Sequence, residues 1–224
     1  MNEVTIQEVE KLLENEKINY IYSGSSELKL FRPASLNKFS NQNNLFFLRN
    51  YESNNLSTIA DSNNLVILPI SARQEVRIHG NFLFTENPEI SFYKIATLFK
   101  EIKESFISDK AYISSGISIG EEVTIDPFTF IGPNVVIGSN VSIGPGCIID
   151  NCIIGDFTII QAGISVGGDA LGAIKDASQN WVDRPHFKKV LIGSRVRLED
   201  KVVINRGFLE DTFIADEVRI GASI

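Results

Sequence analysis

The second half of the chain is patterned by large apolar side chains that recur every six residues. One run of isoleucines keeps this spacing without a gap: Ile113, Ile119, Ile125, Ile131, Ile137, Ile143 and Ile149. A small or β-branched residue often stands four positions after the isoleucine, as Val123 and Thr129 do. A period of six is neither the helical period nor the strict alternation of a half-buried strand. It indicates a solenoid, in which each repeat packs only on its neighbours.

We therefore expect a coil with three flat sides, in which three strands of about six residues make one turn. The isoleucine of each strand points inward, and glycine or residues such as Asn134, Asn140 and Asp150 suit the corners, which need tight backbone angles. Successive turns stack about 4.8 Å apart through parallel hydrogen bonds. The predicted fold class is mainly β, a hexapeptide-repeat parallel β-helix over residues 108–224.

The repeat is interrupted twice. Residues 167–191 leave the register and contain the single tryptophan, Trp181, and one of the two histidines, His186. A shorter break follows between Arg206 and Phe213. Long departures from a regular scaffold are commonly functional, so we expect a site at the excursion 167–191.

Residues 1–107 lack the repeat and have the pattern of a small α+β domain. Thr5 and Glu8 have the spacing of a capping box, and a helical apolar stripe then runs to about Glu16. Strands are expected at 18–22, 45–48, 65–70 and 82–85, and a last helix at 91–106. We place the domain boundary between residues 107 and 108.

Composition and charge narrow the classes of function. The 224 residues carry 21 basic and 28 acidic side chains, a net charge of −7, which argues against nucleic acid or an anionic membrane as a partner. No apolar run reaches the roughly 18 residues of a transmembrane segment, and no secretory signal is visible. Two cysteines, Cys147 and Cys152, make no disulfide framework, so we expect a cytoplasmic protein. Two histidines, His79 and His186, argue against a metal site built from histidine.

Several segments together resemble one known family. They are the hexapeptide coils, the excursion Val166–Gly172, the pair Trp181–Val182 and the segment Ile204–Thr212. Leu45–Asn50 and Asn87–Pro88 extend the match into the N-terminal half. In these segments the chain resembles UDP-3-O-acylglucosamine N-acyltransferase of lipid A biosynthesis, and the resemblance covers nearly the whole chain.

The resemblance implies a left-handed coil, a homotrimer and active sites between neighbouring subunits. In such enzymes the amine of a UDP-linked amino sugar attacks a thioester carried by acyl-carrier protein or coenzyme A. A histidine takes the proton of the amine, and a backbone amide holds the oxyanion. The expected partners are therefore a UDP-amino sugar, acyl-carrier protein or acyl-CoA, and further copies of this chain. No permanently bound cofactor and no metal is expected.

The resemblance also nominates substrate-binding residues. Phe47, Asn50 and Tyr51 match the segment that stacks the uracil ring in the family, and Asp169 matches its excursion. Tyr51 follows Asn50 directly, whereas the family's tyrosine stands three residues after the asparagine. Judged by residue type alone, an aromatic residue at a strand end is more often core, and an aspartate in a glycine-rich segment is more often a turn residue.

The catalytic base is not identified by the sequence. The resemblance places the family's histidine beyond Ile224, and Gly221 stands where the family has an aspartate. His186 is the one histidine of the repeat half, but its position is not catalytic in the family. Because loss of such a base costs about 10² to 10⁴ in rate, we expect the 224-residue chain alone to transfer acyl groups poorly or not at all.

Two other functions fit parts of the pattern. A non-catalytic trimeric scaffold or sugar-nucleotide-binding module would need no base. A γ-type carbonic anhydrase on the same coil would need three histidine zinc ligands, which His186 alone does not supply. For a trimer, the outward apolar positions Val136, Ile148 and Phe157 are expected to form the association surface.

Overall fold

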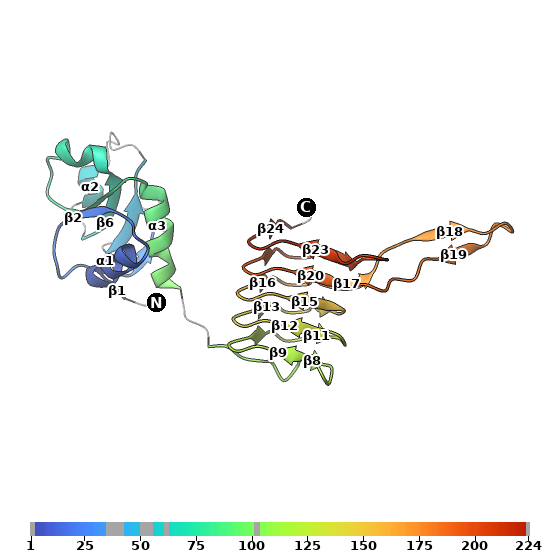
Figure 1. Ribbon diagram of the computed structural model, residues 1–224. Coiled ribbons are helices and arrows are strands. Elements are labelled where there is room, and N and C mark those ends of the chain that lie inside the picture. The colour runs from blue at the N-terminus through green and yellow to red at the C-terminus, as the bar shows by residue number, and fades with distance from the viewer. Residues whose placement is uncertain (1–2, 35–42, 50–55, 61–62, 101–103, 223–224) are drawn as a thin grey trace. The chain divides into compact units, whose positions relative to one another are not determined.

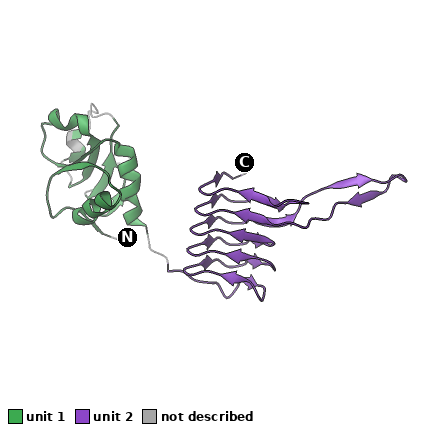
Figure 2. Ribbon diagram, in the orientation of Figure 1, with its two compact units in different colours: residues 1–103 green, residues 104–224 purple. Residues whose placement is uncertain are grey.

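The computed structural model describes residues 3–34, 43–49, 56–60, 63–100 and 104–222. The chain divides into two compact units, residues 1–103 and residues 104–224, which have different colours in Figure 2. We call them the first unit and the coil unit. Each has its own hydrophobic core and is described by itself.

The first unit contains short elements around one mixed sheet. Its strands are β1 (Val4–Thr5), β2 (Tyr20–Ser23), β3 (Lys29–Leu30), β4 (Arg32–Pro33), β5 (Asn44–Phe47), β6 (Leu65–Pro69) and β7 (Asn81–Thr85). Its helices are α1 (Ile6–Asn15), α2 (Leu56–Ala60) and α3 (Pro88–Ala96), with 3-10 helices η1 (Ile70–Gln74) and η2 (Thr97–Phe99). The sheet has the order β2-β7-β6-β5-β4, with β2 antiparallel to β7 and the other neighbours parallel.

Both faces of this sheet are covered. Successive residues of a strand point to opposite faces, so Leu45 and Phe46 enter different cores. Leu45 packs in a cluster that includes Val9 of α1 and Ile95 of α3. Phe46 packs in a second cluster that includes Ala72 of η1. The four predicted strands of this unit are confirmed to within two residues at each end.

The predicted helix starting at the capping box is confirmed. Glu8 N donates to Thr5 Oγ1 at 3.3 Å, and Thr5 N donates to Glu8 Oε2 at 2.8 Å. The hydrogen bonds that Thr5 N and Thr5 Oγ1 donate to Glu8 Oε2 lower the pKa of Glu8, because they favour its charged form. The helix ends at Asn15, one residue before the predicted position.

The helix predicted over residues 91–106 is wrong at both ends. It begins at Pro88, because the side chain of Asn87 accepts a hydrogen bond from Ile90 N and caps the first turn. It ends at Ala96 and continues only as the 3-10 helix η2. Apolar spacing alone does not mark a cap, so the pattern gave the wrong limits.

The coil unit forms the expected parallel β-helix. Its coil strands are β8 (Tyr112–Ile113), β9 (Ser118–Ile119), β10 (Thr124–Ile125), β11 (Phe130–Ile131), β12 (Val136–Ile137), β13 (Ser142–Ile143), β14 (Ile148–Ile149), β15 (Cys152–Ile154), β16 (Ile159–Ile160), β17 (Ser165–Asp169), β20 (Val190–Ile192), β21 (Arg197–Leu198), β22 (Val203–Arg206), β23 (Thr212–Ile214) and β24 (Arg219–Ile220). They make three parallel sheets, β10-β13-β16-β21-β24, β22-β17-β14-β11-β8 and β23-β20-β15-β12-β9 (Figure 1). Ile131 pairs with Ile149, so one turn takes 18 residues. The predicted fold class, mainly β with a β-helix behind a small α+β unit, is confirmed.

The inward isoleucines form one continuous core. Ile125, Ile131, Ile143 and Ile149 have no exposed surface, and the thiols of the coil are buried with them. Cys147 fills an inward small-residue position, as its place in the repeat indicates. Among the described residues, no helix is both long and apolar enough to cross a membrane.

The glycines that follow the repeated isoleucines do not form the corners of the coil, contrary to the expectation from the sequence. The left-handed corner positions are taken by Asn134 and Asn140, by Asn151 rather than Asp150, and by glycines that do not follow the repeated isoleucine, such as Gly146 and Gly163. Gly120 lies instead where the next turn passes, because a Cβ on it would be 2.6 Å from the carbonyl carbon of Gly138. Such glycines let successive turns approach each other, whereas residues outside the repeated apolar positions make the corners.

Two faces of the coil carry rows of exposed apolar side chains. The sheet that contains β14 presents Tyr112, Phe130, Ile148 and Val203, and the sheet that contains β15 presents Val136, Ile153 and Phe213. The rings of Tyr112 and Phe130 stack with centroids 5.1 Å apart. Phe157 is also exposed, but it has a left-handed backbone at a corner and belongs to neither row.

Candidate functional site

The excursion folds into a two-stranded arm that projects from the coil (Figure 1). Its strands β18 (Ala173–Lys175) and β19 (Trp181–Asp183) pair antiparallel. Asp176 holds the connecting turn, because its carboxylate accepts hydrogen bonds from the backbone N–H groups of Asn180 and Ser178. The hydrogen bonds from Asn180 and Ser178 lower the pKa of Asp176.

An ion pair at the base of the arm joins the two breaks of the repeat. Arg206 Nε donates to Asp169 Oδ1 at 2.6 Å, and the two residues are partners in the pairing of β17 with β22. The hydrogen bond from Arg206 lowers the pKa of Asp169, and the charges of Arg206 and His186 act in the same direction. The side chain of Asp169 is 56% exposed and that of Arg206 is 22% exposed. Asp169 is therefore the partner that a ligand can reach.

Asp169 reaches Arg206 through an irregularity in β17. The register of β17 against β22 shifts between Val166 and Asp169. Between them Gly167 has a φ of 84°, and a Cβ on it would overlap the carbonyl oxygen of Asp150. Only glycine fits there, because it combines a left-handed backbone with a close backbone approach.

His186 lies near the Asp169–Arg206 ion pair, and we call these residues together the cluster at the base of the arm. The N–H groups of Phe187 and Lys188 donate to the carbonyl oxygens of Phe208 and Gly207, both at 3.3 Å. The imidazole packs edge-on against the Phe208 ring, with centroids 6.3 Å apart. Among the described residues, His186 Nδ1 is buried and has no hydrogen-bond partner. Buried polar atoms are nearly always hydrogen-bonded, so this nitrogen is an exception among the described residues.

A hollow of about 660 Å³ lies along the arm. It is lined by Leu171, Gly172, Ala173, Trp181, Asp183 and Arg184. Leu171 is completely exposed, and Lys175 Nζ lies 5.1 Å from the centre of the Trp181 ring. The hollow thus combines apolar surface for a chain or ring with nearby cations that can pair with phosphate.

The nominated aromatic residue of the first unit packs against its last helix. Phe47 is half-buried at the end of β5, with its ring centroid 4.8 Å from that of Phe92 and 6.3 Å from that of Tyr93. Asn50 and Tyr51 lie outside the described residues. Helix α3 therefore already occupies part of the surface of the Phe47 ring.

The structure brings one nominated residue, Asp169, together with His186, whose position the resemblance does not mark as catalytic, and adds two residues that the sequence did not assign to the site. Arg206 is the ion-pair partner of Asp169, and the ring of Phe208 packs against the imidazole of His186. Both lie in the second break of the repeat, where periodicity no longer fixes position. In the sequence, the interruption of the repeat was the one feature that pointed to these two residues. Within the described ranges, no group of three or more His, Cys, Asp or Glu side chains could hold a metal ion.

Comparisons with known proteins bear on this architecture. The chain is 35% identical over 161 residues to "UDP-3-O-acylglucosamine N-acyltransferase" of Coxiella burnetii (strain RSA 493 / Nine Mile phase I), covering 62% of this chain and 47% of the relative. The resemblance to this family is confirmed. A second relative, "Probable UDP-3-O-acylglucosamine N-acyltransferase 2, mitochondrial" of Arabidopsis thaliana, is 38% identical over 72 residues, 32% of this chain and 24% of the relative. The chain spans about half the length of the Coxiella relatives.

A family model and solved structures also match the chain. A family model described as the GMPPB C-terminal domain matches residues 113–209. Among solved structures, the acetyltransferase domain of PglB from Neisseria gonorrhoeae FA1090 in complex with acetyl coenzyme A aligns with a TM-score of 0.30 and 12% identity. That alignment covers 71% of this chain and 68% of the other. The segment 113–209 contains both the arm and the Asp169–Arg206 pair.

Proposed function

We propose that this protein transfers an acyl group from a thioester carrier to the amine of a UDP-linked amino sugar, as in lipid A or surface-polysaccharide biosynthesis. The observation that carries the proposal is the 35% identity over 161 residues to relatives of that name. The proposed donors are acyl-carrier protein and coenzyme A thioesters. Because the chain spans 47% of those relatives, the activity, the substrates and the partners all belong to the proposal.

The cluster at the base of the arm supplies groups that this chemistry needs. The amine nitrogen attacks the thioester carbon, a base takes a proton from the amine, the C–S bond breaks, and the base returns the proton to the departing thiolate, which leaves as the thiol. His186 is the candidate base, since histidine exchanges protons near neutral pH and its Nδ1 lacks a partner among the described residues. The hydrogen bond from Arg206 lowers the pKa of Asp169 and so keeps a charged carboxylate in the same cluster as His186.

We assign uridine binding to the first unit, with Phe47, Asn50 and Tyr51 as the residues proposed to contact the ring. Removing a ring that stacks on a base costs roughly 1–3 kcal/mol of binding. Phe47→Ala should therefore weaken UDP-sugar binding by about that amount, measured by calorimetry. Phe47→Leu is the control for lost packing against Phe92, since it keeps most of the apolar volume. If both variants bind like the wild type, Phe47 does not contact the ring.

The proposed assembly is a homotrimer in the cytoplasm. Two faces of the coil carry apolar rows, which include Phe130, Ile148 and Val136, and a threefold arrangement would cover both rows. The buried free thiols Cys147 and Cys152 agree with a reducing compartment. We expect sedimentation to give a species of three chains of 24.9 kDa each, and Ile148→Glu to dissociate it. A wild-type monomer at micromolar concentration would contradict the assembly.

Acyl transfer to UDP-amino sugars tests the function, with coenzyme A and carrier-protein thioesters of several chain lengths as donors. Whatever turnover the chain shows should fall by about 10² to 10⁴ in His186→Ala, with little change in UDP-sugar affinity. His79→Ala in the first unit is the matched control and should leave turnover unchanged. Tight UDP-sugar binding without turnover for any donor would instead favour the non-catalytic module. The same assay tests the sequence-based expectation that the chain alone is nearly inactive.

A further inference from the structure

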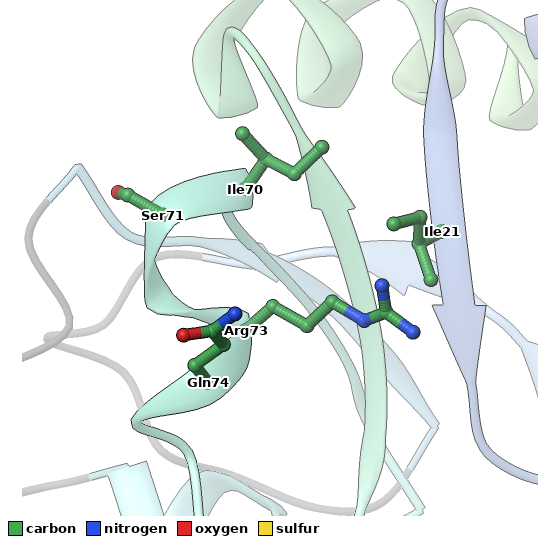
Figure 3. Close-up of a pocket in the computed structure, with 5 residues that line it drawn as sticks. All are labelled: Ile21, Ile70, Ser71, Arg73 and Gln74. Carbon is green, nitrogen blue, oxygen red and sulfur yellow. The ribbon is translucent and has the colours of Figure 1, made fainter.

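The first unit contains a groove that the proposed function does not use. A hollow of about 650 Å³ lies between η1 and the edge strand β2, and it is lined by Ile21, Ile70, Ser71, Arg73 and Gln74 (Figure 3). A smaller hollow of about 270 Å³ shares Ile21 and Arg73, and its other lining residues are Tyr22, Ser23, Val76, Ile78, Phe82 and Phe84. We call the two hollows together the η1–β2 groove.

A fixed backbone positions Arg73 in this groove. Ala72 is completely buried in the core cluster of that face, and its carbonyl accepts hydrogen bonds from Glu75 N at 3.0 Å and Val76 N at 3.1 Å. The turn therefore leaves Arg73 exposed on the side of β2. Figure 3 shows its side chain extended from η1 toward Ile21.

The guanidinium of Arg73 has no hydrogen-bond, ion-pair or aromatic partner among the described residues. Arg49 and Arg195, by contrast, pair with Glu89 and Glu217. No lining residue of the groove is acidic, although the chain has 28 acidic side chains. A guanidinium with free donors binds carboxylate and phosphate in a two-pronged manner.

The rest of the groove is mostly apolar. Ile70 is 41% exposed and Ile78 is 38% exposed, while Phe82 and Phe84 are nearly buried in the sheet. Small-molecule sites generally combine such an apolar lining with a few polar groups that fix orientation. The alternative is that the Arg73 stem only covers apolar surface and leaves its charged end in water. The two interpretations differ in whether the charge itself contributes to binding.

We propose that the η1–β2 groove binds a small amphiphilic anion, a carboxylate or phosphate on an apolar chain or ring. Arg73 pairs with the anionic group, and Ile21, Ile70 and Ile78 contact the apolar part. This site goes beyond the proposed acyl transfer. It lies on the sheet face opposite to that of Phe47, since Phe47 packs with one core cluster and Phe82 and Phe84 belong to the other.

Two dyes that differ only in charge test the proposal on the full chain. The probes are anilinonaphthalenesulfonate and its uncharged parent, phenylnaphthylamine, followed by fluorescence titration. Arg73→Gln should weaken binding of the sulfonate by about tenfold, which is about 1.4 kcal/mol, and leave the parent dye unchanged. Ile21→Glu, which places a carboxylate opposite Arg73, should have at least the same effect. Arg77→Gln is the matched control, because it removes an equal charge outside the groove.

Competition then identifies the anionic group. Decanoate or decyl phosphate should displace the sulfonate dye from the wild type, and inorganic phosphate at the same concentration should not. The proposal is overturned if Arg73→Gln binds the sulfonate as the wild type does. It is also overturned if Arg73→Gln, with an unchanged melting temperature, loses both dyes equally, because Arg73 would then act only through its apolar stem.

Discussion

The position of Asp169 depends on one glycine, and a matched pair of substitutions can test this. Gly167 has a φ of 84°, and a Cβ on it would overlap the carbonyl oxygen of Asp150. Gly146 has a similar φ of 68°, but nothing lies within 4 Å of the place its Cβ would take. Substituting alanine at each position therefore separates the cost of a left-handed backbone from the cost of a steric overlap.

The expected magnitudes differ clearly. Gly146→Ala should lower the free energy of unfolding by roughly 1–2 kcal/mol, the cost of the left-handed conformation for an L residue. Gly167→Ala bears the same cost and must also displace a backbone carbonyl of the preceding turn, so we expect a loss of about 4 kcal/mol or more, which is exceptional for one substitution. At about 4 °C per kcal/mol for a unit of this size, the melting temperature should fall by about 4–8 °C in the first case and by about 16 °C or more in the second.

Thermal unfolding followed by circular dichroism measures both variants against the wild type. Because Gly167 precedes Asp169 in the same strand, the Asp169–Arg206 ion pair should also be lost in Gly167→Ala and kept in Gly146→Ala. The pKa of the Asp169 carboxyl, followed by NMR, reports the pair. If the two variants melt within a few degrees of each other, the overlap at Gly167 is relieved at little cost. The argument that only glycine fits this strand would then be wrong.

Three further predictions concern single groups of the coil unit. Asp169 should titrate below its ordinary pKa, and Arg206→Gln should raise that pKa in an NMR titration. Since the pKa is lowered by folding, the pair should stabilise the protein above the unfolded pKa, and this contribution should disappear as the pH falls through the folded value. Ile149→Ala should lower the free energy of unfolding in urea by about 2–5 kcal/mol, because Ile149 has no exposed surface. Burial raises the pKa of Cys152 to about 12, so Ellman's reagent should label it only after unfolding; rapid labelling of the native protein would contradict this.

The sequence by itself determined the coil. One residue type repeated every six positions both defines the turn and supplies the buried column, so Ile125 or Ile149 could be placed inside before any contact was known. The same regularity showed where the chain leaves the coil, and hence where to look for a site. The capping box before α1 was equally local, since Thr5 and Glu8 are three residues apart and need no other part of the chain.

Only the tertiary structure decided what the breaks contain. Asp169 and Arg206 are 37 residues apart, and both lie where the repeat no longer predicts position, so the breaks indicated a site but not that these two side chains pair. The role of Gly120 depends on a neighbouring turn of backbone, and the groove at Arg73 depends on a strand about 50 residues earlier in the chain. Periodicity describes which face a residue takes along its own strand. It does not describe which side chain of a distant segment will meet it, because that depends on how loops close and pack in three dimensions.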